Sequence, residues 1–157
     1  MTLETAGRTP KRIIFLLGFA GLCLLLALGL AWVLGITLFF PDGALARKIV
    51  ERQDLIRAHI DYLMMSQFLF LFALLLRQYR VTPPLWAIAA SCFGAFNNPL
   101  AFVLRALKPK VDPSIVPEPH FPLAAGVSFT CITLGFLALV FLVARAAWKA
   151  RDGALSS

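Results

Sequence analysis

The chain has 157 residues, of which 60% are hydrophobic and only 15% are charged. Soluble domains carry about 25% charged residues, so this composition excludes a soluble globular protein and indicates a chain largely covered by lipid. The net charge of +7 would suggest a nucleic-acid partner for a soluble protein, but anionic lipid headgroups account for it here, and we expect no nucleic-acid partner.

Apolar segments in the first half of the chain predict two transmembrane helices. The first is expected at about residues 13–40, which hold no Asp, Glu, Lys or Arg, a length sufficient to cross a bilayer with tilt. The second is expected at about residues 44–78 as one continuous helix, because positions from Leu45 to Ala73 follow helical spacings of three and four. Its amphipathic first part is expected in the membrane interface, with Asp54 and the other charged side chains in water.

Two further helices are expected in the second half. Thr82 and Pro83 are typical of a helix N-cap and first position, and they open a helix at about residues 83–107. The last helix is expected at about residues 122–148. Between these two, residues 105–121 form a loop with four prolines, which predicts a stiff connection.

The predicted fold is therefore an all-α integral membrane bundle of four helices, a single domain over residues 1–157. Four crossings put both termini on one face, which holds eight of the fifteen Lys and Arg residues. This small excess favours cytoplasmic termini. We expect the chain in the inner membrane of a bacterium. Four helices enclose little volume, so a site for a cofactor and a substrate indicates a homo-oligomer.

Polar residues within the spans are expected at a common depth, near the face opposite the termini. At ~1.5 Å per residue, Gln67, Asn98 and Thr130 fall into one layer. Ser66, Asn97 and Ser128 are expected beside this layer, and His59, Tyr62 and Arg105 above it. Such a layer indicates a site that opens toward one leaflet. Polar side chains at matching depth also hydrogen-bond membrane helices to one another without any ligand, and both interpretations stay open.

His59 is the residue with the most specific candidate chemistry. An interfacial histidine can hydrogen-bond to lipid headgroups, and a neutral imidazole is also the common axial ligand of haem iron. Met65 could then pack against a porphyrin or serve as a second ligand, although methionine more often fills a core. Arg105 ends a seam of small residues on the third helix, from which it could reach Glu118 or a ligand carboxylate such as a haem propionate.

The chain resembles the styrene oxide isomerases in three features. These are the four-helix topology, the triplet Arg57-Ala58-His59 at the start of the second helix, and an asparagine in the third helix. The resemblance implies a trimeric membrane protein that binds haem b at a subunit interface, with His59 as the axial ligand. It also implies that ferric iron acts as a Lewis acid on an epoxide oxygen, after which a hydride shift gives an aldehyde. The family asparagine six residues after the histidine is Met65 here, and the family aspartate and tyrosine around the helix-three asparagine are absent.

We therefore expect a haem b protein that isomerises a small apolar substrate such as an epoxide. The expected catalytic residues are Asn97, Asn98, Tyr62 and Gln67, of which Tyr62 and Gln67 would replace the missing phenol and amide. The expected cofactor-binding residues are His59, Arg57, Met65, Ser66 and Arg105, with His59 on the metal. The alternatives are a non-catalytic haem or quinone subunit in electron transfer and a cofactor-free membrane interaction protein.

Overall fold

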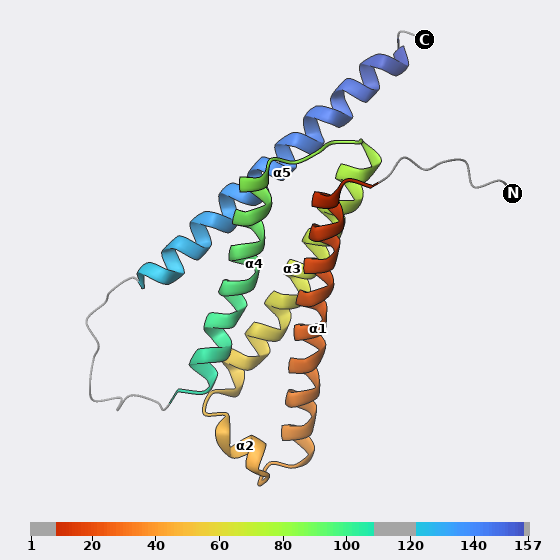
Figure 1. The fold of residues 1–157 in the computed structure, drawn as a ribbon. Coiled ribbons are helices and arrows are strands. Elements are labelled where there is room, and N and C mark those ends of the chain that lie inside the picture. Colours follow the sequence, from red (N-terminus) through yellow and green to blue (C-terminus); the bar gives the residue numbers. More distant parts are fainter. Residues whose placement is uncertain (1–8, 109–121, 156–157) are drawn as a thin grey trace, which may run out of the picture.

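The computed structural model describes residues 9–108 and 122–155, and every regular element in these two ranges is an α-helix (Figure 1). The helices are α1 (Lys11–Phe39), α2 (Ala44–Lys48), α3 (Arg52–Gln78), α4 (Leu85–Ala106) and α5 (Leu123–Leu155). All except the short α2 contain a stretch long and apolar enough to cross a membrane. The predicted all-α membrane bundle of four helices is confirmed.

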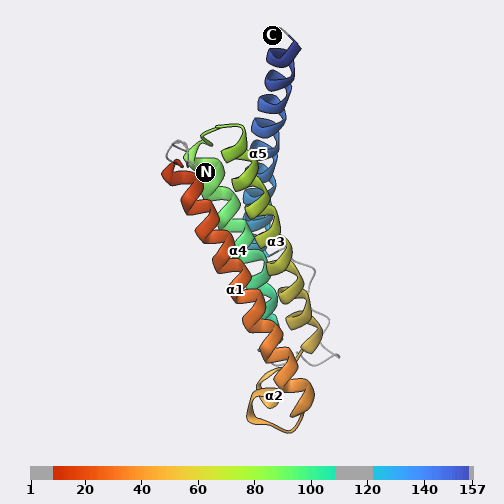
Figure 2. The ribbon, with the colours of Figure 1, turned by 90° about the vertical axis from the view of Figure 1, so that its right-hand side faces the viewer.

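The four long helices pack in a row that begins with α1 and ends with α5. α1 packs chiefly against α3, α3 packs also against α4, and α4 packs against α5 (Figure 1). The beginning of α1 and the end of α5 lie at the same end of the bundle, as four crossings require (Figure 1). The last turns of α5 extend beyond the other helices, which is clearest from the side (Figure 2).

Large apolar side chains cover the outer surface of every long helix. Trp32 on α1, Leu71 on α3, Trp86 on α4 and Phe141 on α5 are all exposed. Exposing this much apolar surface to water would cost roughly 25 cal/mol per Å², whereas contact with lipid tails carries no such cost. The surface is therefore one that a bilayer covers, and the chain is an integral membrane protein.

The structure differs from the predicted continuous helix over residues 44–78, because the chain leaves the helical conformation between α2 and α3. The backbone N–H groups of Val50 and Glu51 both donate to the carbonyl of Ala106, at 2.9 and 3.2 Å. The Glu51 side chain then caps α3 by accepting from the N–H of Gln53 at 3.3 Å. These bonds to the end of α4 replace the intrahelical bonds that a continuous helix would make.

The helix boundaries in the second half also differ from the prediction. Thr82 and Pro83 do not open α4; Pro84 is its N-cap, in an extended conformation, and the helix begins at Leu85. The physical reason is that a residue before proline is disfavoured in the helical region, so Pro84 keeps Pro83 out of the helix. α5 begins at Leu123 and continues to Leu155, beyond the predicted end at residue 148.

The loop predicted at residues 105–121 is shorter in the structure, since its first two residues belong to α4. Residues 109–121, which include Glu118 and all four loop prolines, lie outside the described residues.

The predicted seam of small residues on α4 is the surface that meets α5. Ser91 and Gly94 are buried there, and glycine at position 135 of α5 lies directly against Ser91. A side chain on either glycine would collide with backbone atoms of the other helix. The absence of a Cβ at these two positions therefore brings the two helix backbones close together.

Candidate functional site

His59 lies on α3 and faces α1. Its Nδ1 atom is 2.8 Å from the carbonyl oxygen of Ala27, and the side chain is half-buried. When Nδ1 carries the proton and donates to this carbonyl, Nε2 keeps a lone pair that can bind a metal. Ligating histidines commonly hold their second nitrogen in this way, because the bond fixes both the tautomer and the ring orientation.

Two other predicted site residues hold α3 to its neighbours. The Ser66 hydroxyl donates to the carbonyl of Ala20 on α1 at 2.9 Å, and the Tyr62 hydroxyl donates to the carbonyl of Phe96 on α4 at 3.1 Å. Both side chains are almost fully buried. Each hydroxyl proton is thus used in a contact between helices, which is the ligand-free interpretation of polar residues in a membrane bundle.

A charge cluster lies where α3 begins and α4 ends. One oxygen of Asp54 is 3.1 Å from Arg57 Nη1, and the other is 3.1 Å from Arg105 Nη2. The Asp54 side chain is only 5% exposed, so the expectation that it faces water is wrong. The two arginines are more than half exposed, and their charges stabilise the buried carboxylate.

This cluster also changes the expected roles of the two arginines. Arg105 pairs with Asp54, a residue on another helix, whereas the expected partners were Glu118 or a ligand carboxylate. The sequence contains a partial signal for the cluster, because Asp54 and Arg57 are three residues apart on one helix. Nothing in the sequence pattern indicates the contact with Arg105, which is 51 residues away.

Replacing Asp54 with asparagine is expected to lower the free energy of unfolding by about 1–2 kcal/mol, because the two arginines lose their charged acceptor. Thermal unfolding of the detergent-solubilised protein measures the effect. Asp42→Asn is the matched control, since this exposed carboxylate makes no ion pair within the described parts of the chain. Equal melting temperatures for the two variants would show that the cluster does not stabilise the bundle.

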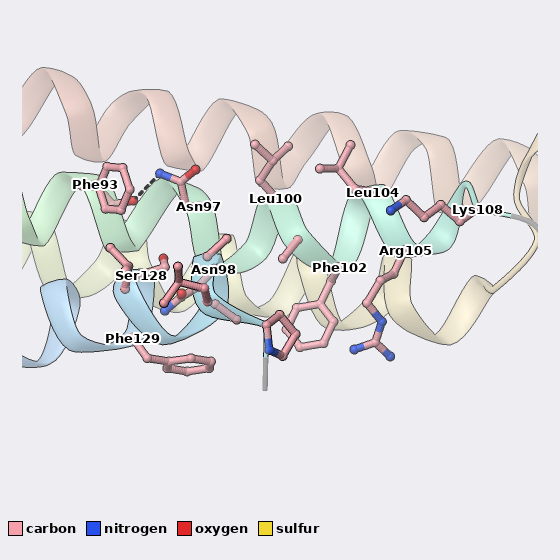
Figure 3. A pocket seen from close by; sticks show the side chains of 16 residues that line it. Phe93, Asn97, Asn98, Leu100, Phe102, Leu104, Arg105, Lys108, Ser128 and Phe129 are labelled. Atoms are coloured by element: carbon pink, nitrogen blue, oxygen red, sulfur yellow. Dashed lines mark hydrogen bonds between the residues drawn. The ribbon is translucent and has the colours of Figure 1, made fainter. Parts of the chain in front are cut away.

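A cavity of about 710 Å³ lies between the second half of α4 and the beginning of α5 (Figure 3). Asn97, Asn98 and Arg105 are the predicted site residues that line it. Asn97 donates from Nδ2 to the carbonyl of Phe93 at 2.8 Å. Asn98 is 8% exposed, and its amide makes no hydrogen bond within residues 9–108 and 122–155.

Ser128, on α5, is a further polar residue of this cavity. It is not among the catalytic or cofactor-binding residues that the sequence predicts. It is 3% exposed, and its hydroxyl has no hydrogen-bond partner in the described part of the chain. By depth alone, the sequence predicts Ser128 beside the polar layer. Its position on the side of α5 that faces α4 could not be read from depth alone.

The other predicted site residues do not line the cavity. His59, Arg57, Tyr62, Met65, Ser66 and Gln67 are all outside its lining. Gln67 and Thr130 are exposed on the outer surface of the bundle, and Met65 packs against the core. Within one chain, the members of the expected polar layer face different helices, the cavity or the outer surface, so the described residues do not bring them together in a single pocket.

Within the described residues, no group of three or more His, Cys, Asp or Glu side chains could hold a metal ion. His59 is the one histidine in that part of the chain, because His120 lies outside it. Comparisons with protein-family models, with curated proteins and with solved structures found no match for this chain. The resemblance to the styrene oxide isomerases therefore stays a prediction that depends on the triplet at positions 57–59 and an asparagine of α4.

Proposed function

We propose that this integral membrane protein binds haem b through His59 and isomerises small apolar epoxides to carbonyl compounds. The observation that supports the proposal is the hydrogen bond between His59 Nδ1 and the Ala27 carbonyl at 2.8 Å. This bond directs one ring nitrogen to the backbone and leaves Nε2 for iron. His59 is half-buried, so the side chain is not enclosed by its own bundle.

Large apolar side chains close in sequence to His59 and to Ala27 suit a porphyrin chemically. Met64 and Ile60 on the same helix, and Leu28 next to Ala27, are large apolar side chains with exposed surface. Apolar surface near an imidazole suits the face of a porphyrin and would help to exclude water from a bound haem. Bound ferric haem would supply a Lewis acid that polarises an epoxide oxygen.

A homo-oligomer is part of this proposal, with three copies implied by the resemblance. Within one chain, His59 faces α1 whereas Asn98 lines the cavity between α4 and α5. A second copy covering the exposed side of His59 would enclose a bound group that one chain leaves open to lipid. The proposed location is the inner membrane of a bacterium. Placing both termini in the cytoplasm is supported by the slight excess of basic residues on that face.

The second candidate is a cofactor-free membrane protein. It is favoured by the observation that His59, Tyr62 and Ser66 each hydrogen-bond to a backbone carbonyl of another helix. Such bonds are worth about 0.6–2 kcal/mol each and need no ligand. The two candidates differ at His59, where only the haem protein uses the second ring nitrogen.

The enzymatic part of the proposal is tested with the oxidised, haem-loaded protein and a panel of aryl and alkyl epoxides, without any reductant. The expected result is an aldehyde or ketone isomeric with at least one epoxide, detected by gas chromatography, and no product with His59→Ala. A haem-loaded protein that converts none of them would contradict the isomerase and would leave the non-catalytic haem subunit as the remaining haem candidate.

A further inference from the structure

We propose that the cavity between α4 and α5 binds an anionic glycerophospholipid of the surrounding membrane. Its phosphate would lie at Arg105 and Lys108, its ester carbonyls at Asn98 and Ser128, and one acyl chain between the two helices. This inference goes beyond the proposed haem function and is independent of it, because His59 does not line the cavity.

The size and lining of the cavity suit a lipid chain. Its volume of about 710 Å³ falls within the ~300–1,000 Å³ of typical ligand sites. The walls are mostly apolar and include Phe93, Phe102, Leu104, Val127 and Phe129. Because the cavity lies between two helices that span the membrane, lipid is the apolar molecule present there at the highest concentration.

Positive charge gathers at one end of this cavity. Arg105 and Lys108 both lie at that end (Figure 3). Arg105 shares the single carboxylate of Asp54 with Arg57, and Lys108 makes no ion pair within the residues that the structure describes, so the local charge remains positive.

The first turn of α5 belongs to the same lining, since residues 122–125 contribute to the wall. The beginning of a helix carries the positive end of the helix dipole and favours phosphate. Two cationic side chains and this helix end together fit a phosphate better than a neutral headgroup.

Two buried polar groups identify the rest of the ligand. Asn98 and Ser128 line the cavity at 8% and 3% exposure, and neither side chain has a hydrogen-bond partner within the described ranges. A polar group left unpaired in an apolar environment costs roughly 1–3 kcal/mol, so an oxygen-bearing ligand would be favoured there.

The depth of these groups matches the ester region of a phospholipid. Ser128 follows the start of α5 by five residues, about 7.5 Å along the helix, and Asn98 precedes Arg105 by seven, about 10 Å. Ester carbonyls lie just below the phosphate and accept hydrogen bonds, so they would pair with the Asn98 amide and the Ser128 hydroxyl. A hydrocarbon chain without esters would leave both unpaired.

The test is native mass spectrometry of the full chain titrated with phosphatidylglycerol, phosphatidylcholine or diacylglycerol. Phosphatidylglycerol is expected to bind more tightly than the other two. Lys108→Gln is expected to weaken it about fivefold, from the loss of one positive charge near the headgroup. Ser128→Ala is expected to weaken it by roughly 2–10-fold through the lost hydrogen bond.

Each of these variants has a matched control elsewhere on the same pair of helices. Lys149→Gln removes one charge at the opposite end of α5, and Ser91→Ala removes the other buried hydroxyl that lacks a partner in the described residues, outside the cavity. Both controls should bind phosphatidylglycerol like the wild type. Ser128→Ala should also unfold at the wild-type temperature, since the hydroxyl makes no bond that the substitution removes.

The proposal is overturned if the three lipids bind equally, or if the two cavity variants bind phosphatidylglycerol as tightly as their controls. Equal binding of diacylglycerol would mean that the charged end does not recognise phosphate. The proposed function can fail independently of the lipid site. A haem-free protein that still selects phosphatidylglycerol would contradict the haem proposal and support the lipid site. A haem-loaded protein without lipid selectivity would contradict the lipid site and leave the haem proposal standing.

Discussion

Gly94→Ala is expected to lower the free energy of unfolding by about 1–3 kcal/mol, because it forces α4 and α5 apart. A Cβ at this position would lie 2.8 Å from the backbone nitrogen of Ile132 and 2.8 Å from the carbonyl oxygen of Ser128. Both are backbone atoms, so no side-chain rotation relieves the collision. Gly135→Ala should behave alike, since its Cβ would lie 2.6 Å from the backbone nitrogen of Ser91.

Gly21 and Gly29 on α1 provide matched controls, because nothing lies within 4 Å of a Cβ built on either residue. Alanine is favoured over glycine inside a helix by up to ~1 kcal/mol, so these two substitutions should leave the melting temperature in detergent unchanged or raise it. If Gly94→Ala unfolds at the same temperature as Gly29→Ala, the close packing of α4 against α5 does not exist in the folded protein.

His59→Asn is expected to reduce bound haem by at least about tenfold while leaving the fold nearly as stable as the wild type. The asparagine amide occupies the place of the Nδ1 edge of the ring and can still donate to the Ala27 carbonyl, but it has no counterpart of Nε2. His59→Ala removes both functions, so it should lose haem and also about 0.6–2 kcal/mol of stability.

Comparing His59→Asn with His59→Ala separates the contribution of His59 to haem binding from its contribution to the packing of α3 against α1. Imidazole added to His59→Ala should restore part of the haem absorbance, because it supplies the missing ligand without restoring the covalent link to α3. Retention of wild-type haem by His59→Asn would show that the residue serves only as a contact between α3 and α1.

The sequence was sufficient to predict the long helices, because uncharged runs of the required length leave no other structure in a bilayer. It was not sufficient to predict the break between α2 and α3. That break depends on hydrogen bonds from Val50 and Glu51 to Ala106, more than fifty residues away in the chain. The helical periodicity of residues 44–78 continues through the break and gives no sign of it.

The sequence was likewise insufficient to predict which polar side chains share a site. Counting residues from the end of a span gives the depth of a polar side chain but not the direction in which it points. Asn97 and Asn98 have nearly the same depth, yet one bonds to its own helix and the other lies buried in the α4/α5 contact. Gln67 lies at a similar depth and is exposed. Helix packing sets these directions.

The central claim is that His59 binds haem b, and the absorption spectrum of the full-length protein tests it most directly. The protein should be purified in mild detergent from haem-replete cells, and its haem content measured as the pyridine haemochrome. We predict a Soret band with stoichiometric haem b in the wild type and its loss in His59→Asn. A colourless, haem-free wild-type protein from the same cells would contradict the claim.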